Sequence, residues 1–246
     1  MMKICLDPGH GGFDPGAVGL AGTKEKDIAL VLAKKVAALL RPAYEVKLTR
    51  ETDVHFDKTE SVDQIKRAMV ANAWGADLFV SIHCNAAKND RTANGAEVYN
   101  YIGSKEGKKL AAEIFKLLPS ALAIRGRGVK EVLNFCVLEK TDCPAVLVEV
   151  AFISNEQEEA LLKTADFQNR AAWAIASGIA SYCGTPLCRP VQTDPASGVR
   201  VTARGKTVAT GRTIDGQTWV PVREILAALG FSVTWDENKR EVIIDG

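Results

Sequence analysis

The chain has no long apolar run and no excess of charge of one sign, and each of these absences excludes a class of protein. No apolar stretch of about 18 residues occurs, so no membrane-spanning helix is predicted. Three apolar residues lie between Lys3 and Asp7, fewer than the roughly 7–15 of a signal peptide, so we expect no signal peptide. The 31 Lys and Arg residues nearly balance the 30 Asp and Glu residues, which disfavours nucleic acid as a partner despite the basic segment RGRGVK at 125–130.

Cysteine and histidine are both scarce. The six cysteines form no CxxC pair and most lie in apolar runs, which favours buried, reduced thiols over a disulfide framework. Cys183 and Cys188 flank a predicted linker, and the sequence leaves open whether they pair. The chain has three histidines, His10, His55 and His83.

The composition, with 47% hydrophobic and 25% charged residues, is typical of a globular protein. The length of 246 residues leaves room for one large domain and one small one. After Cys183 the segment GTPLCRPVQTDPASG interrupts any periodic pattern with prolines and glycines. We therefore predict a large domain at 1–183, a linker at 184–198 and a small domain at 199–246, which is marginal for independent stability.

Strands and helices alternate along the large domain. This alternation predicts an α/β fold with an open, largely parallel twisted sheet covered by helices on both faces. The small domain combines short alternating runs with one helix, REILAALG, and is expected to be α+β. In the large domain we expect strands near 3–7, 44–50, 76–83, 95–101, 134–138 and 145–151, and helices from an N-cap at Thr23 to about 40, and near 61–74, 105–118, 155–163 and 167–182.

Four polar residues lie where such a sheet would bring them together, because sites gather at the carboxyl ends of parallel strands. His10 follows the first strand in a Gly-rich turn, and His83 ends another strand. Glu149 lies in the apolar run LVEV, where a carboxylate needs a partner or a metal. Glu25 lies at a helix start, where the helix dipole favours an acidic residue in any protein. A histidine in a Gly-rich turn, such as His10, can likewise be an ordinary turn residue.

Two histidines and a carboxylate are a common ligand set for zinc, with a fourth position left for water. His10, Glu25 and His83 fit this set for one Zn²⁺ ion. His55 is expected to be an ordinary loop or surface residue. Cys84 is not expected to bind zinc, because successive strand residues point to opposite faces.

Several motifs carry a resemblance to a known family. They are LDPGHGGFDPGAVG at 6–19, EKD at 25–27, LTR at 48–50, ADLFVSIHCNAA at 76–87, NGAEVY at 94–99, RGVK at 127–130 and PAVLVEVAFISN at 144–155. In these motifs the chain resembles the zinc-dependent N-acetylmuramoyl-L-alanine amidases of the type-3 class, over nearly all of residues 2–183. It departs from the commonest pattern at Ala151 and Glu139, neither of which is a proposed ligand.

The resemblance implies a cell-wall lytic enzyme that hydrolyses the amide between N-acetylmuramic acid and L-alanine in peptidoglycan. It implies that His10, Glu25 and His83 bind zinc, and that Glu149 is the catalytic carboxylate, which takes a proton from water and passes it to the leaving nitrogen. Asn85 and Arg127 also lie in family motifs. We expect them near the site, either in contact with substrate or behind the ligands.

The segment from Val199 to Gly246 resembles the small domain found at the amino terminus of copper amine oxidases. It contains no histidine, cysteine or methionine, so no copper site is expected. Wall attachment and homodimer formation are the two hypotheses for this segment. An anchoring tail without a signal peptide suggests a phage or prophage endolysin, made in the cytoplasm and released at lysis, although an autolysin exported by another route would have the same sequence features.

Two alternatives remain open. The amidase-like domain could recognise peptidoglycan without cutting it, although an intact Glu149 argues against this. A zinc peptidase that cuts within the stem peptide would use the same metal chemistry and differ in the shape of its pocket.

Overall fold

The computed structural model describes residues 1–185, 187, 198–203, 206–214, 217–236 and 241–245. The chain divides into two compact units, Met1–Leu187 and Cys188–Gly246. Most of the expected linker lies outside the described residues. Cys188 and the possible pair between Cys183 and Cys188 also lie outside the described residues.

Unit 1 is built on a six-stranded sheet with the strand order β2-β1-β3-β6-β4-β5. β2, β1, β3 and β6 are mutually parallel, whereas β4 runs antiparallel to β6 and pairs in parallel with β5. The expected open, largely parallel sheet is therefore confirmed. The strands are β1 (Lys3–Pro8), β2 (Glu45–Leu48), β3 (Leu78–Asn85), β4 (Ala96–Tyr101), β5 (Gly126–Val132) and β6 (Ala145–Phe152).

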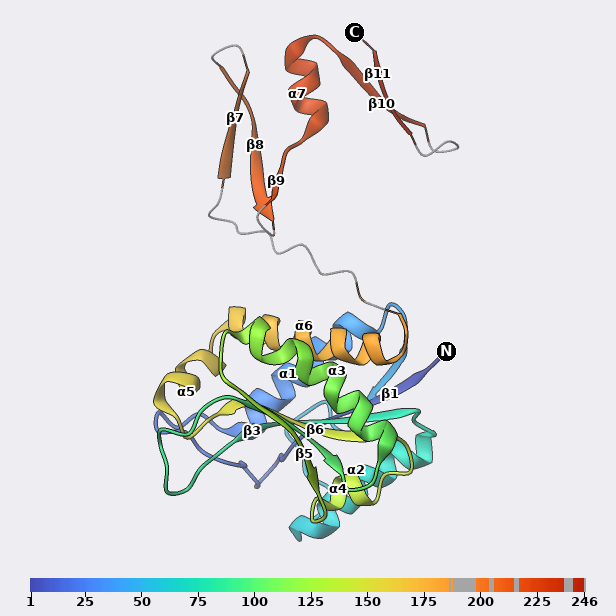
Figure 1. The fold of residues 1–246 in the computed structure, drawn as a ribbon, viewed down its shortest axis with the longest axis vertical. Coiled ribbons are helices and arrows are strands. Elements are labelled where there is room, and N and C mark those ends of the chain that lie inside the picture. The colour runs from blue at the N-terminus through green and yellow to red at the C-terminus, as the bar shows by residue number, and fades with distance from the viewer. Residues whose placement is uncertain (186, 188–197, 204–205, 215–216, 237–240, 246) are drawn as a thin grey trace. The chain divides into compact units, whose positions relative to one another are not determined.

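Helices cover both faces of this sheet. Figure 1 shows α1 (Glu25–Leu40), α3 (Lys105–Leu122) and α6 (Ala165–Tyr182) together on one face. The opposite face carries α2 (Glu60–Trp74) and the single turn α4 (Cys136–Glu139). A further short helix, α5 (Glu156–Leu162), follows β6.

The alternation of side chains along each strand divides the core into two clusters. One cluster fills the space between the sheet and α1, α3 and α6, and the other lies under α2 and α4. On β3, for example, Val80 and Ile82 belong to the first cluster and Phe79 to the second. Farther along the second face, the apolar residues give way to the polar Ser81 and His83, so the carboxyl end of this face is the polar one.

Two local predictions are wrong. The run predicted as a strand at 134–138 contains no strand: its last three residues belong to α4 (Cys136–Glu139), and the strand lies earlier, at β5. A run this short has no periodicity that separates a strand from one helical turn, and either form buries Val137 and Leu138. The N-cap of α1 is Lys24 rather than Thr23, and it makes no side-chain cap hydrogen bond.

Unit 2 is a small α+β structure. β7 (Gly198–Ala203), β8 (Lys206–Ile214) and β9 (Gln217–Trp219) form an antiparallel sheet. α7 (Val222–Leu229) follows, and β10 (Ser232–Asp236) pairs with β11 (Glu241–Asp245) in an antiparallel hairpin. None of the helices in the described part of the chain combines the length and apolar character that crossing a membrane requires.

Candidate metal centre

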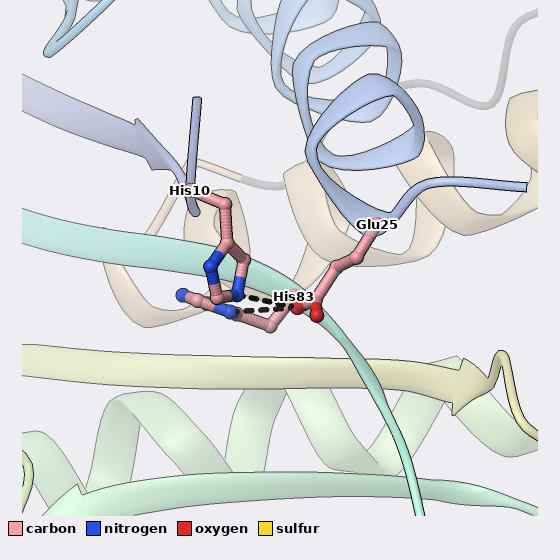
Figure 2. Close-up of side chains that lie close together, drawn as sticks. All are labelled: His10, Glu25 and His83. Carbon is pink, nitrogen blue, oxygen red and sulfur yellow. Dashed lines mark hydrogen bonds and ion pairs between the residues drawn. The ribbon is translucent and has the colours of Figure 1, made fainter. Parts of the chain in front are cut away.

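Three potential metal ligands from separate parts of the chain meet at the carboxyl end of the sheet (Figure 2). His10 lies in the turn after β1, Glu25 is the first residue of α1, and His83 lies near the end of β3. One donor atom from each lies within 4.8 Å of the others. The rings of His10 and His83 meet edge to face, with centroids 4.9 Å apart.

The Glu25 carboxylate is the centre of this group. Its Oε1 accepts hydrogen bonds from His83 Nδ1 at 2.8 Å and from the Cys84 backbone amide at 3.0 Å, and it lies 3.2 Å from His10 Nε2. Its Oε2 accepts from the Ala17 amide at 2.9 Å. Burial alone would raise the pKa of Glu25, but the hydrogen bonds from His10 and His83 hold it well below its usual value.

The donor set fits a zinc ion. Burial would lower the pKa of His10, but hydrogen bonds to Glu25 and Asp14 raise it to about 9, so without a metal this ring carries a proton that faces a carboxylate. A divalent cation supplies the same positive charge, and two imidazoles with one carboxylate are a common Zn²⁺ ligand set.

Asp14 supports this interpretation and was missed in the sequence. Its Oδ2 lies 2.7 Å from His10 Nδ1, while its Oδ1 accepts from the Gly16 amide at 2.9 Å. A carboxylate on the far nitrogen orients a metal-binding histidine and makes it a stronger ligand. The sequence feature that could have identified Asp14 is its position four residues after His10 in the same Gly-rich turn.

Two glycines leave room for the ligands. A Cβ on Gly9 would collide with the ring of His83. At Gly16, where φ is +64°, a Cβ would lie 2.6 Å from His10 Cδ2 and 2.7 Å from Glu25 Oε2. The Gly-rich turn after β1 is thus required for packing around the site as well as for its backbone conformation. His10 itself has φ +59°, a strained value for a residue with a side chain.

A buried arginine of α2 fixes the turn that carries His10. Arg67 donates to Asp7 Oδ1 at 3.0 Å, to the Pro8 carbonyl at 2.8 Å and to the His10 carbonyl at 2.7 Å. It also pairs with Asp63 one turn earlier on the helix. The position of His10 therefore depends on the docking of α2 against the sheet.

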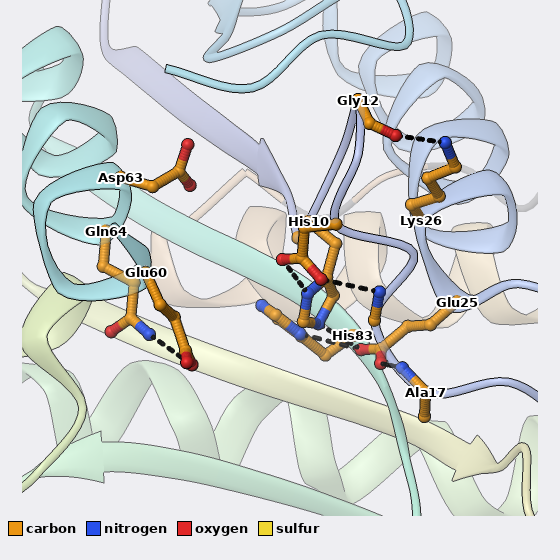
Figure 3. Close-up of polar contacts among 12 residues, drawn as sticks. His10, Gly12, Ala17, Glu25, Lys26, Glu60, Asp63, Gln64 and His83 are labelled. Carbon is orange, nitrogen blue, oxygen red and sulfur yellow. Dashed lines mark hydrogen bonds and ion pairs between the residues drawn. The ribbon is translucent and has the colours of Figure 1, made fainter. Parts of the chain in front are cut away.

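The ligands open into a cavity of about 280 Å³. Figure 3 shows its α2 wall, where Glu60, Asp63 and Gln64 face the histidines. Glu149 also lines the cavity, because β6 pairs with β3 in a register that places it beside His83.

Glu149 differs from its neighbours on β6. It is partly exposed to the cavity while Val148 and Val150 are fully buried, and its Oε2 is buried without a hydrogen-bond partner among the described residues. Burial, with a smaller contribution from the negative charges of Glu25 and Glu97, raises the pKa of Glu149 well above its usual value. A carboxyl group in this state is suited to take up and release protons.

The comparison with known proteins agrees with this geometry. Residues 4–181 match the N-acetylmuramoyl-L-alanine amidase family. The chain belongs to this family. The resemblance predicted from the sequence is confirmed, and so is its class, a cell-wall lytic amidase.

Named relatives support the assignment. The endolysin of Bacillus phage SPP1 is 42% identical over 186 residues, which are 72% of this chain and 64% of that protein. The amidase AmiA of Escherichia coli (strain K12) is 33% identical, over 73% of this chain and 75% of AmiA. The catalytic domain of CwlV, an N-acetylmuramoyl-L-alanine amidase from Bacillus (Paenibacillus) polymyxa var. colistinus, superposes with a TM-score of 0.69 at 38% identity, over 75% of this chain and 99% of that domain. Residues 202–246 match the copper amine oxidase N-terminal domain, as expected.

The other residues singled out in the sequence lie as follows in this amidase. Asn85 lines the cavity, whereas Arg127 is not part of its wall and pairs with Glu97, a buried carboxylate that the sequence analysis missed. The side chain of Cys84 belongs to the main core cluster. His55 lies outside the ligand group and packs against Phe13, with ring centroids 4.0 Å apart.

Proposed function

We propose that the protein hydrolyses the amide between N-acetylmuramic acid and L-alanine in peptidoglycan, with one Zn²⁺ ion bound by His10, Glu25 and His83. The observation that carries the proposal is the convergence of these three donors beside Glu149, which lines the same cavity and whose buried Oε2 has no hydrogen-bond partner among the described residues. A bound Zn²⁺ ion would polarise the substrate carbonyl and make water more acidic at its open position.

The residues of the chain have distinct roles in this proposal. Asp14 keeps the Nδ1 side of His10 occupied, so that Nε2 points to the Glu25 carboxylate. Glu149 accepts a proton from the attacking water and returns it to the nitrogen of the departing L-alanine. Its buried Oε2 favours the protonated form that the second half of this transfer needs.

End-group analysis of digested peptidoglycan tests the proposal. The purified protein is incubated with peptidoglycan, with and without a chelator, and new amino-terminal L-alanine is compared with new reducing sugar. New alanine amino groups that disappear on chelation are the expected result. New amino groups on other stem residues would indicate a peptidase, and binding to peptidoglycan without any new end group would indicate a non-catalytic binding protein.

An endolysin of a Bacillus phage and the N-acetylmuramoyl-L-alanine amidase LytC of Bacillus subtilis (strain 168) both match this catalytic region, so the proposed activity fits either a phage or a bacterial enzyme. We propose that residues 199–246 attach the enzyme to the cell wall. Homodimer formation through the same residues stays a prediction.

A further inference from the structure

A buried carboxylate beside the cavity has four donors and no role in the chemistry described above. Glu97 on β4 is 1% exposed. Its Oε1 accepts from Arg127 Nε and from Lys130 Nζ, the latter at 2.6 Å. Its Oε2 accepts from the Tyr99 hydroxyl and from Asn85 Nδ2 at 3.0 Å. Burial would raise the pKa of Glu97, but the hydrogen bonds from Arg127, Lys130 and Tyr99 lower it to about 2, so the group is an acceptor only.

This chemistry fixes which way the Asn85 amide points. A side-chain amide has a donor end and an acceptor end, and an ionised carboxylate can bind only the donor end. Asn85 must therefore direct Nδ2 toward Glu97, which leaves Oδ1 as the free end. Among the described residues Oδ1 has no hydrogen-bond partner, and it is not one of the buried unpartnered atoms.

Asn85 lines the cavity. It closes β3 two residues after His83, and the pairing of β3 with β6 shifts register between these two residues. Such irregularities re-aim side chains at the ends of strands. Asn85 lines the same cavity as Glu149, and Glu97 is directly opposite Glu149 in the pairing of β4 with β6.

We propose that Asn85 accepts a hydrogen bond from an amide N–H of the stem peptide, and that Glu97 is the positioning residue that keeps Asn85 Oδ1 turned toward the substrate. The proposal rests on the proposed function, because it takes a muramoyl-peptide as the occupant of the cavity. Arg127 and Lys130 then act indirectly, by keeping Glu97 ionised. This accounts for Arg127, which lies in a family motif but does not line the cavity.

Substrate analogues test the proposal with the full-length, zinc-loaded protein. The all-amide substrate is N-acetylmuramoyl-L-alanyl-D-isoglutamine. Two analogues each replace one stem N–H by an ester oxygen, the first at the bond to be cut and the second at the following bond. For Asn85→Ala we expect kcat/KM to fall about tenfold on the all-amide substrate. On one of the two ester analogues the wild type and Asn85→Ala should differ by less than about twofold.

Variants of Glu97 separate positioning from structural support. The amide of the Glu97→Gln variant can offer Asn85 either a donor or an acceptor, so it no longer fixes which way the Asn85 amide points. We expect this variant to lose most of the same tenfold in kcat/KM while keeping one zinc per chain. Asn85→Asp places two carboxylates against each other and should be impaired. Combining Asn85→Asp with Glu97→Gln restores one donor facing one acceptor at the original net charge, and should recover activity relative to Asn85→Asp. Glu131→Gln on β5, which removes an exposed ion pair with Lys108, is the control.

The outcomes separate the two proposals. Failure of the zinc-loaded wild type to release L-alanyl-D-isoglutamine from the all-amide substrate would overturn the proposed function and this assignment with it. Release by the wild type, with an Asn85→Ala defect of equal size on all three substrates, would overturn the assignment alone. No recovery in the double variant, in a protein that retains zinc and wild-type circular dichroism, would also overturn it.

Discussion

Glu149 and Glu25 are the same type of residue, yet the two carboxyl groups lie in opposite environments. Glu25 has four hydrogen-bond or ion-pair partners and a lowered pKa. Glu149 has a raised pKa and a buried oxygen without a hydrogen-bond partner in the part of the chain that the structure describes. Environments that push two carboxyl groups apart in pKa assign them different roles. Here Glu25 is suited to bind a cation and Glu149 to transfer a proton.

We expect Glu149→Gln to keep one zinc per chain and to lose activity. The loss in kcat should be about 10²–10⁴-fold, the usual contribution of a general acid–base group. Metal content by elemental analysis and turnover of a soluble muramoyl-peptide are measured on the same preparation. Loss of zinc together with activity would instead make Glu149 a ligand.

Gly16→Ala should weaken zinc binding by at least about tenfold, because the new Cβ would displace the His10 ring and the Glu25 carboxylate. The control is Gly75→Ala at the end of α2. Gly75 has nearly the same φ, +68°, but nothing lies within 4 Å of its Cβ position. Both variants should lose about 1 kcal/mol of stability from backbone strain. Equal zinc affinities in a chelator competition would show that the ligands tolerate the extra carbon.

At the scale of elements, α2 holds the site together from the side opposite α1. Arg67 is 2% exposed and joins this helix to Asp7, to the turn carrying His10 and to Asp63. Its guanidinium lowers the pKa of Asp7, although burial acts in the other direction. Removing one partner of a buried ion pair leaves the other charge uncompensated.

Arg67→Ala should therefore reduce the free energy of unfolding by about 3–5 kcal/mol. Lys109→Ala, which removes an exposed pair with Glu106 on α3, should change it by at most about 1 kcal/mol. Urea denaturation of both variants provides the comparison. Similar values for the two would mean that α2 docks without the arginine.

The pairing of β4 with β5 brings Arg127 and Lys130 to Glu97 and predicts a pH dependence at this carboxylate. Its pKa is lowered from 4.5 to about 2 in the folded protein, so it contributes stability that is fully present above pH 4.5 and is lost as the pH falls toward 2. The difference in unfolding free energy between wild type and Glu97→Gln should be largest near neutral pH and shrink between pH 4.5 and 2. A difference that stays constant over this range would show that the carboxylate gains nothing from its cationic neighbours.

At the scale of the whole molecule, the proposed metal ligands, Glu149 and both core clusters lie in unit 1. The CwlV catalytic domain matches this unit over nearly its full length. A chain ending at Leu187 should therefore fold and cut a soluble muramoyl-peptide with kcat/KM within about twofold of the full chain. If residues 199–246 attach the enzyme to the wall, the shorter chain should also pellet less with purified walls. Undiminished pelleting would remove the attachment hypothesis.

The sequence predicted the ligand candidates because each lies in a local pattern, such as the Gly-rich turn around His10 or the apolar run around Glu149. It missed Asp14 and Glu97. Asp14 looked like one more turn residue, and Glu97 looked like an ordinary strand residue in NGAEVY. Their partners become visible only when the side chains are placed.

The sequence by itself determined the alternation of strands and helices and the family, because periodicity and motifs are local properties of the chain. Only the tertiary structure decided that β6 lies between β3 and β4, and this order places Glu149 beside His83 and opposite Glu97. It also decided that a helical turn, Cys136–Glu139, forms where a strand was predicted at 134–138. Strand order and register depend on how distant segments bury one another, and no local pattern records that choice.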